Sequence, residues 1–398
     1  MDNIVISTTL ENVCLKQNKS IISGPFGSNI SSKFFVERGI PVIRGNNLTV
    51  GKEKFLDYGF VYVTDEKAKE LNCYALKDDL IFTSAGTLGQ VGIIPENARF
   101  KEYVISNKQI RVRIDNDIIL PIYAYYWFSS PWIQKKLCDN NKGSTVPLLT
   151  LSEIKSLPIK YPKDINEQKK IVNILNSIDE QLKRNSEMVQ KLQVLSQTIF
   201  NKFFNNKIYE FNGILHDLCT LPSGFSFEPS YYVTGGKYKL ITIKNVNGIF
   251  VDTDRVDTLN EIPSRMKDYC NLTKGDILIS LTGNVGRISI NSSSNCLLNQ
   301  RVSKIVCSND KYKFYLYLLL STNYYQGKMQ QMASGTSQKN LSPLDVENLR
   351  IFIPDNIDEF NNATKNILCQ LCEINTFSVR LQDLKNKILP LLINRQIE

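Results

Sequence analysis

The feature that most limits how this chain can fold is a phrase that it carries twice. Residues 76–92 read L-K-D-D-L-I-F-T-S-A-G-T-L-G-Q-V-G, and residues 272–288 read L-T-K-G-D-I-L-I-S-L-T-G-N-V-G-R-I. Other echoes share a nearly constant offset, such as S-G-P-F at 23–26 and S-G-F-S at 223–226. An offset of about 192–200 residues is far longer than the repeat unit of a solenoid. The sequence therefore predicts two copies of a whole domain within its 398 residues.

Each copy begins with a globular part, in which short apolar runs alternate with Gly, Asn and Pro. Runs of this length and punctuation are typical of β-strands. One aromatic-rich helix is expected after the strands of each copy, at Ile122–Cys138 and at Lys313–Met332. The expected strands are Pro41–Arg44, Leu80–Thr83, Val91–Ile94 and Ile110–Ile114 in the first copy, and Tyr238–Ile243, Asp276–Ser280 and Val302–Val306 in the second.

Each copy ends in a long amphipathic helix. Apolar residues from Ile171 to Phe203 alternate at spacings of three and four, with two polar interruptions, and a similar seam runs from Ile367 to Leu391. This spacing is typical of a coiled coil. Each helix of about 40 residues would be ~60 Å long and could not bury its seam alone. We therefore expect an α+β fold, with two pseudo-repeated mixed sheet and helix domains joined by two long antiparallel coiled-coil helices.

Prolines mark the expected boundaries. Pro162 and Pro354 precede the two long helices, and Pro390 is expected to kink or fray the end of the second. The expected segments are a first globular domain at 1–162, a central helix at 163–206, a second globular domain at 207–354 and a C-terminal helix at 355–398.

Composition and motifs argue against several classes of protein. No apolar run reaches the roughly 18–20 residues of a membrane helix, and the N-terminus does not read as a signal peptide, so a cytoplasmic location is expected. The only histidine is His216, which makes histidine-based acid–base catalysis improbable. Nine scattered cysteines do not suggest a disulfide framework. Cys369 and Cys372 lie at i, i+3 in a helical pattern and are expected to pack in the core rather than bind a metal.

Three glycines of the first phrase, Gly86, Gly89 and Gly92, invite comparison with a phosphate-binding loop. The comparison fails because no G-x-x-x-x-G-K-[S/T] string exists and because the stretch lies between two predicted strands rather than before a helix. Glycine tolerates positive φ at tight turns between strands. The sequence therefore predicts a turn here and no nucleotide cofactor.

Charge and loop chemistry point to nucleic acid. The net charge of +9 and the isoelectric point near 8.9 favour an anionic partner. Short polar and basic residues flank the repeated turn, and such side chains bind phosphates or base edges from loops on a rigid sheet. The residues predicted to contact DNA are Arg44, Asn46, Asn47, Ser84, Thr87, Gln90, Lys108, Gln109, Arg111, Arg113 and Lys142 in the first copy, and Lys244, Asn245, Asn247, Ser280, Thr282, Asn284, Arg287, Gln300, Arg301, Lys304 and Lys339 in the second.

These motifs, in this order and twice over, resemble the specificity (S) subunit of a type I DNA restriction–modification system. The resemblance rests on G-P-F-G-S at 24–28, G-I-P-V-I-R at 39–44, the repeated phrase, and the exits from each globular part into E-Q-K-x-I-V-x-I-L helices. It covers essentially the whole chain. The single motifs are weak, and their repeated order carries the identification.

The resemblance implies that each globular copy is a target recognition domain that reads one half of a split, asymmetric target in double-stranded DNA. The helices would form a spacer that fixes the distance between the halves and docks two methyltransferase subunits, and a nuclease–translocase subunit can join. The chain would perform no catalysis. S-adenosylmethionine would belong to the methyltransferase partner, and ATP and Mg²⁺ to any nuclease partner.

Alternatives remain open at this point. Residues Asp78-Asp79 stand where the second copy has Gly275-Asp276, which leaves the DNA contact there undecided. The chain could serve a related restriction class whose methylase and nuclease share one partner chain, and the co-purifying partners would decide that. It could also be a coiled-coil scaffold without DNA. An enzyme is disfavoured because no Asn-Pro-Pro-aromatic stretch or convincing nuclease set is present.

Overall fold

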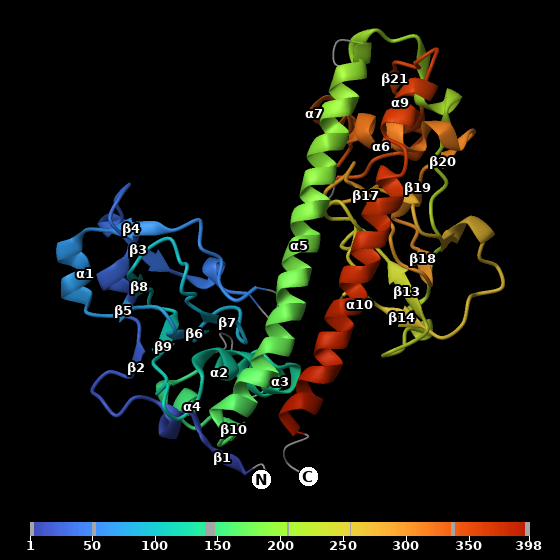
Figure 1. Ribbon diagram of the computed structural model, residues 1–398. Coiled ribbons are helices and arrows are strands. Elements are labelled where there is room, and N and C mark those ends of the chain that lie inside the picture. The colour runs from blue at the N-terminus through green and yellow to red at the C-terminus, as the bar shows by residue number, and fades with distance from the viewer. Residues whose placement is uncertain are drawn as a thin grey trace. The chain divides into compact units, whose positions relative to one another are not determined.

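The computed structural model describes residues 4–49, 53–139, 148–204, 207–254, 256–335 and 339–394. The chain divides into two compact units, one comprising Met1–Gln181 with Leu381–Glu398 and the other Leu182–Arg380. Each unit holds one copy of the repeat and a part of each long helix, α5 (Ile165–Phe204) and α10 (Ile367–Asn394) (Figure 1). The predicted two-copy organisation and the predicted α+β class are confirmed.

Two four-stranded sheets form the first copy. One has the order β2–β9–β6–β7, with every pair antiparallel, and the other has the order β4–β3–β8–β5, in which β3 and β8 are parallel. The strands are β1 (Val5–Thr9), β2 (Ile21–Ser23), β3 (Ile40–Ile43), β4 (Val61–Val63), β5 (Tyr74–Ala75), β6 (Leu80–Thr83), β7 (Val91–Ile93), β8 (Tyr103–Ile105), β9 (Gln109–Val112) and β10 (Pro158–Pro162). The helices before α5 are α1 (Asp65–Leu71), α2 (Pro121–Phe128), α3 (Pro131–Asp139) and α4 (Leu151–Lys155).

The second copy repeats this plan with shorter strands. Its two larger sheets have the orders β17–β16–β19 and β14–β13–β18–β15, and β13 and β18 are again parallel. The two-stranded sheets are β11–β21 and β12–β20 here and β1–β10 in the first copy. The strands are β11 (Gly213–Ile214), β12 (Cys219–Thr220), β13 (Tyr238–Ile241), β14 (Thr258–Leu259), β15 (Asn271–Leu272), β16 (Ile277–Ser280), β17 (Ile288–Ile290), β18 (Cys296–Leu298), β19 (Val302–Lys304), β20 (Val306–Cys307) and β21 (Arg350–Ile351). The helices before α10 are α6 (Lys313–Leu320), α7 (Asn323–Met332), α8 (Pro343–Glu347) and α9 (Asp358–Ala363).

All seven predicted strands exist, but each aromatic-rich helix is broken in two. In the first copy the break precedes Pro131, which has no amide hydrogen to continue the helix. In both copies a glutamine side chain then closes the break. Gln134 Nε2 donates to the carbonyl of Phe128 (2.7 Å), and Gln326 Nε2 donates to the carbonyl of Leu320 (2.7 Å). The prediction of one continuous helix per copy was therefore wrong, because the side-chain cap supplies the partner that a further turn would have supplied.

Helices α2 and α6 are buried on nearly all sides, as expected of helices that are apolar all round. In the first unit α2 packs with β6, β7 and β9 and with the start of α5 in one hydrophobic cluster. In the second unit α6 packs with β16, β17 and the last turns of α5 in another. Each copy is thereby joined to the long helices through a continuous apolar core.

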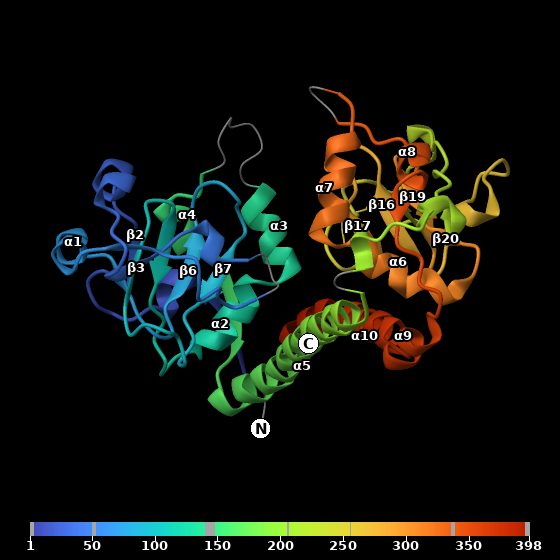
Figure 2. The ribbon, with the colours of Figure 1, turned by 90° about the horizontal axis from the view of Figure 1, so that it is seen from above.

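Helices α5 and α10 pack together and run antiparallel (Figure 2). In the first unit Asp179 contacts Lys385, and in the second unit Asn185 Nδ2 donates to Ser378 Oγ (2.9 Å). The partner number falls as the α5 number rises, which is the antiparallel order that the sequence predicted. Helix α10 has 28 residues rather than the expected 40 or so, because Asn366 adopts φ +70° and separates it from α9. It nevertheless continues beyond Pro390.

The next observations concern membrane helices, metal sites and cysteines, and they apply to the described residues. Within them, no helix combines the length and the apolar character needed to span a bilayer. No group of three or more His, Cys, Asp or Glu in the described ranges could hold a metal ion. Eight of the nine cysteines have described side chains, and these are free thiols. Cys372 packs in the core as predicted, whereas Cys369 is exposed, so the prediction for this pair was half right.

Candidate nucleic-acid interface

The glycines of the repeated phrase form the same turn in both copies. Gly86 and Gly89 have φ angles of +100° and +86°, and their counterparts Gly283 and Gly286 have +71° and +77°. Residues with side chains rarely adopt these angles. The turns join β6 to β7 and β16 to β17, so the prediction of a tight inter-strand turn is confirmed.

The repeated aspartates are buried inside the fold. Asp79 is 1% exposed and Asp276 is 3% exposed. Each accepts the amide of the residue three positions earlier, at 2.8 Å and 2.7 Å. Asp79 also takes a two-bond contact from Arg113 (2.8 and 2.7 Å), and Asp276 pairs with Lys304 Nζ at 2.8 Å. The phrase is thus repeated because its aspartate forms a charge pair behind the turn in each copy. The basic partner is Arg113 in the first copy and Lys304 in the second.

The repeated asparagines also serve the fold. Asn47 Oδ1 accepts the amide of Arg44 (3.0 Å), and its Nδ2 donates to the carbonyls of Leu56 and Tyr58 (3.1 and 2.8 Å). Asn245 Oδ1 likewise accepts the amide of Thr242 (2.9 Å). Both asparagines are buried, and both donor hydrogens of Asn47 are used. Asn47 and Asn245 therefore hold their loops in shape rather than offering an amide to a base.

The remaining predicted residues divide by exposure. Half-buried side chains are those of Arg44, Gln90, Arg113, Arg287 and Lys304, and buried ones besides the two asparagines are Ser84, Gln109, Arg111, Ser280 and Thr282. Lys142 lies outside the described residues. The exposed side chains are those of Asn46, Thr87, Lys108, Lys244, Asn247, Asn284, Gln300, Arg301 and Lys339.

Predicted contact residues from three segments of the first copy, near 44–46, 83–90 and 106–109, line one hollow. Its volume is about 670 Å³, and its lining includes Arg44, Asn46, Thr87, Lys108 and Gln109. Gln90 holds the loops together, because its Nε2 donates to the carbonyls of Gly45 and Leu48 (3.0 Å each) and its Oε1 accepts from Thr83 Oγ1 (2.9 Å). Residues that are distant in the sequence thus form one polar surface.

This hollow contains polar atoms that the fold leaves unused. Arg44 Nε and Gln109 Nε2 are buried and have no hydrogen-bond partner among the described residues. A buried donor without a partner costs about 1–3 kcal/mol unless water or a ligand satisfies it. Two such donors at the wall of one hollow, next to the exposed ammonium of Lys108, suit an anionic or base-edge ligand. Arg111 Nε and Nη1 are also buried without a hydrogen-bond partner among the described residues, but Arg111 is not among the residues that line the hollow, and its Nη2 donates to the carbonyl of Lys19.

The predicted loops of the second copy also meet. The amide of Leu281 donates to the carbonyl of Arg301 (3.0 Å), and the amide of Gly283 donates to the carbonyl of Lys339 (2.9 Å). Arg287 Nη1 donates to Asn247 Oδ1 (3.0 Å), which ties the turn to the loop after β13. Thr282 Oγ1 is buried beside this turn and has no partner among the described residues.

Strand register corrects one pairing of the two copies. By residue type, Gln109 with the nearby Arg111 resembles Gln300 with Arg301. In the structure, the amide of Ser84 donates to the carbonyl of Lys108 (2.8 Å), just as that of Leu281 donates to Arg301. Lys108 is therefore the counterpart of Arg301. Arg111 faces Ile81 in the first copy as Lys304 faces Leu278 in the second, so Arg111 corresponds to Lys304.

Two kinds of position emerge. Those identical in both copies, such as Asp79/Asp276 and Asn47/Asn245, hold the loops from inside. Exposed positions on the loops, such as Thr87/Asn284 and Lys108/Arg301, differ between the copies, although Arg111/Lys304, which is not exposed, differs as well. The sequence prediction did not separate them, although identity between the copies was a visible signal. Asn107, which was not predicted, also lines the hollow of the first copy.

Comparison with known proteins adds independent findings. The model of the type I restriction modification DNA specificity domain matches residues 13–193 and again residues 212–377. The two matches correspond to the two copies of the repeat, and together they include most of the chain.

Individual relatives extend along nearly the whole chain. The type I restriction enzyme MjaIX specificity subunit of Methanocaldococcus jannaschii is 23% identical, with 95% of this chain and 92% of the relative covered. The HindI specificity subunit of Haemophilus influenzae is 20% identical, with 94% and 98% covered. The crystal structure of a type I restriction–modification S subunit from M. genitalium has a similar fold, with a TM-score of 0.57, 14% identity, and 98% and 96% covered.

Proposed function

The chain belongs to the type I restriction–modification DNA specificity family, and from this premise we propose how it recognises DNA. Specificity subunits of this family are non-catalytic and provide DNA target recognition within the restriction–modification complex. In the proposal, the globular part of each copy, at 1–162 and 207–354, reads one half of a split, asymmetric target. The long helices, within 163–206 and 355–398, act as the spacer between the two readers.

One observation carries this proposal: side chains that differ between the copies are mounted on a frame that does not differ. The buried pairs around Asp79 and Asp276 and the turns at Gly86 and Gly283 are shared. The exposed side chains beside them differ in size, charge and hydrogen-bonding groups. An unchanged frame with changed loop chemistry is expected of two readers that face the same duplex geometry but select different bases.

The structure reduces the list of proposed contacts. In the first copy we propose base or phosphate contacts from Arg44, Asn46, Thr87, Lys108 and Gln109. Their counterparts in the second copy are proposed on the same loops, and the full second set is Lys244, Asn247, Thr282, Asn284, Arg287, Gln300, Arg301 and Lys339. Lysine and arginine would place the complex on the phosphates, and the shorter polar side chains would select the sequence.

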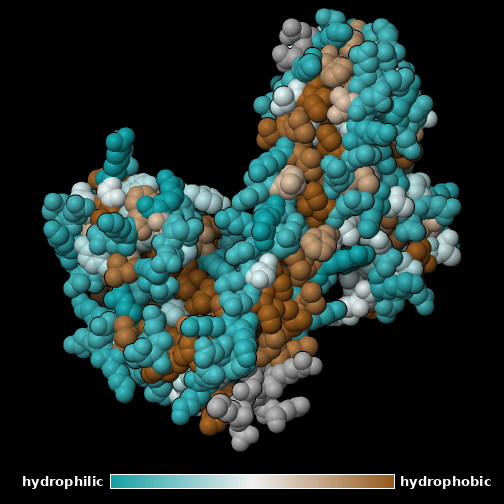
Figure 3. All heavy atoms as spheres, viewed as in Figure 1, coloured by the Kyte–Doolittle hydropathy of each residue, from teal (hydrophilic) through white to brown (hydrophobic). Residues whose placement is uncertain are grey.

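We propose that two methyltransferase subunits dock on the long helices, one on each unit. Each unit carries a pair of apolar side chains seven residues apart that are about half exposed: Leu384 and Leu391 in the first unit, and Met188 and Leu195 in the second. These pairs occupy equivalent positions of the two helices when α5 and α10 are aligned by the repeat. Figure 3 shows hydrophobic side chains gathered along the surface of these helices. Apolar surface of this kind is typical of a face that a partner covers.

Further parts of the assembly follow from the family and are proposed here. S-adenosylmethionine would bind to the methyltransferase partner, and ATP and Mg²⁺ to a nuclease–translocase partner, if one joins. The target base would be flipped by the methyltransferase. The chain would act in the cytoplasm, where the DNA of the host lies.

The decisive test is methylome sequencing of a host that expresses this chain with its neighbouring methyltransferase, compared with a host that lacks only this chain. We expect a split motif that appears only when the chain is present. Unchanged methylation, despite a demonstrated complex of the two proteins, would contradict the proposal and favour a scaffold role. A single partner that combines methylase and nuclease would instead assign the chain to the related restriction class.

A further inference from the structure

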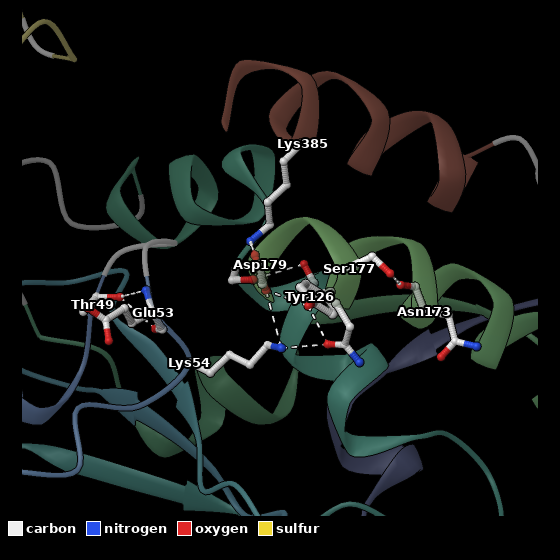
Figure 4. A network of polar contacts seen from close by, with 10 residues as sticks. Thr49, Glu53, Lys54, Tyr126, Asn173, Ser177, Asp179 and Lys385 are labelled. Atoms are coloured by element: carbon white, nitrogen blue, oxygen red, sulfur yellow. Dashed lines mark hydrogen bonds and ion pairs between the residues drawn. The ribbon is translucent and has the colours of Figure 1, made fainter. Parts of the chain in front are cut away.

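A cluster of buried charges joins the first copy to the long helices (Figure 4). Asp179 on α5 pairs with Lys385 on α10 and with Lys54, which lies in the loop after β3 (Lys54 Nζ to Asp179 Oδ2, 3.5 Å). The side chains of Asp179 and Lys385 are 15% and 7% exposed. All three residues belong to the same unit. One carboxylate therefore holds two ammonium groups from two different elements.

Tyr126 on α2 completes the cluster. Its hydroxyl lies 2.6 Å from Asp179 Oδ2 and 2.8 Å from Asn176 Oδ1, and the ammonium of Lys54 donates to the same Asn176 atom (2.7 Å). The ring of Tyr126 faces both ammonium groups, at 5.3 Å and 5.4 Å from its centre. Burial raises the pKa of Tyr126, and Asp179 raises it further, so the hydroxyl stays protonated and remains a donor. Burial lowers the pKa of Lys54, against the attraction of Asp179.

The cluster is connected to the proposed reading surface by one backbone contact. The carbonyl of Lys54 accepts the amide of Ile93 (3.0 Å) at the end of β7, the strand that leaves the Gly86–Gly89 turn. Gly92 lies so close that a Cβ on it would be 3.0 Å from the same carbonyl. A movement of Lys54 would therefore be passed to the turn that carries Thr87.

The second copy contains the same junction without the charges. The amide of Ile290 donates to the carbonyl of Ile249 (2.8 Å), which makes Ile249 the counterpart of Lys54. Matching the two seams and the two aromatic helices gives the other counterparts, which are Leu318 for Tyr126, Asn375 for Asp179 and Val189 for Lys385. Here Asn375 Nδ2 donates to Ser292 Oγ (2.6 Å), so a neutral hydrogen bond ties the helix to the sheet.

We propose that Asp179 is a positioning residue that fixes the orientation of the first reading surface on the long helices and so sets the spacing at which its half-site is read. This inference rests on the proposed function. Asp179 is the one acceptor that links Lys54 to Lys385 in this junction, and loss of its charge would leave the buried Lys385 ammonium without its counter-charge, which is strongly disfavoured. The neutral junction of the second copy has no such dependence.

The test is methylation by the intact complex on a DNA library that contains the split motif with varied spacer lengths. Wild type is expected to methylate one spacer length. Asp179→Asn should keep the half-site letters but extend methylation to spacers one base pair longer or shorter. Lys54→Met, which leaves the Asp179–Lys385 pair intact, should do the same and covers the case in which Asp179→Asn does not fold. Glu187→Gln, an exposed change on α5, is the control.

Rescue separates positioning from mere packing. The combined variant Lys54→Ile, Pro95→Ser, Tyr126→Leu, Asp179→Asn and Lys385→Val installs the neutral junction of the second copy, including the serine that Asn375 contacts there, and should restore a single spacer length. A folded Asp179→Asn or Lys54→Met complex that keeps the wild-type spacer preference would overturn the inference. Absence of any split motif with wild type would instead contradict the proposed function itself.

Discussion

At the scale of single residues, the chemistry of a side chain does not reveal its role. Asp79, Asn47 and Thr87 all have polar side chains. Asp79 and Asn47 are buried and stabilise the fold, whereas Thr87 is exposed to solvent. The difference lies in the partners. Asp79 meets Arg113 from a neighbouring strand segment, and Asn47 meets backbone carbonyls 9 and 11 residues away. Thr87 lies exposed in the turn between β6 and β7.

The buried aspartate gives a stability prediction. Asp79→Asn keeps the shape of the side chain but leaves Arg113, whose side chain is 26% exposed, without its counter-charge. We expect a loss of about 1.5–3 kcal/mol in the free energy of unfolding, the usual contribution of hydrogen bonds to a charged group. Chemical denaturation of the full chain measures it. Asp117→Asn, an exposed change in the same copy, should stay within about 0.5 kcal/mol of wild type.

The exposed turn residues give a specificity prediction. Thr87→Ala should alter the letters of one half-site only, and Asn284→Ala should alter the other, because each lies on the turn of a different copy. A lost base contact is worth about 1–3 kcal/mol of discrimination. The measurement is methylation of a library in which both half-sites are randomised. If either change altered both halves together, the assignment of one reader to each copy would be wrong.

Lys108→Ala supplies a contrasting control. A phosphate contact carries no sequence information, so this change should weaken DNA binding about equally for all sequences and lower the slope of affinity against salt by about one. A change of preferred letters without a change in salt dependence would show that Lys108 reads a base instead.

At the scale of elements, the long helices show how much a repeat pattern can specify. The seam from Ile171 to Phe203 forms one helix of 40 residues, and its polar interruptions, Asn185 and Ser196, are buried and hydrogen-bonded. The aromatic helices behaved differently. Their apolar pattern continued across Ser129–Ser130, but a proline and a side-chain cap ended the helix there.

Lengthening the helix pair gives a prediction at this scale. Insertion of one heptad into both α5 and α10 keeps the seam in register and adds about 10 Å of rise. We expect the methylated motif to keep both half-sites and to gain about three base pairs of spacer, since each base pair of duplex rises ~3.4 Å. A four-residue insertion should also change the spacing without changing the letters. Altered letters in either insertion mutant would contradict a spacer role.

At the scale of the whole molecule, the duplication leaves the chain with two similar units that have diverged in charge. Their helix junctions differ, as Asp179 and Asn375 show, whereas the exposed apolar pairs at Met188/Leu195 and Leu384/Leu391 are kept. Retained apolar exposure in both units is expected if each meets an equivalent partner. The net charge of +9 suits DNA as the further partner.

The number of bound methyltransferase subunits tests whether the exposed apolar pairs are the docking surfaces. The double change Met188→Glu and Leu195→Glu should remove one methyltransferase subunit from the complex, because a buried unpaired carboxylate opposes docking. The double change Leu384→Glu and Leu391→Glu should remove the other, and all four changes should remove both. Native mass spectrometry counts the subunits. Two bound subunits in every variant would place the docking surface elsewhere.

The order of residues was enough to predict the duplication, the strands, the long helical seams and the loops that carry polar groups. These features depend on local periodicity and on glycine at strained turns, and both are visible in the order of residues. The residue order did not show which of the predicted contact residues are exposed. The folded structure was needed to see which polar side chains are buried and that Lys108 corresponds to Arg301. It was also needed to see that Lys54, Asp179 and Lys385 share one cluster. Such pairings join residues up to 206 positions apart. They depend on strand register and helix packing, which no local pattern encodes.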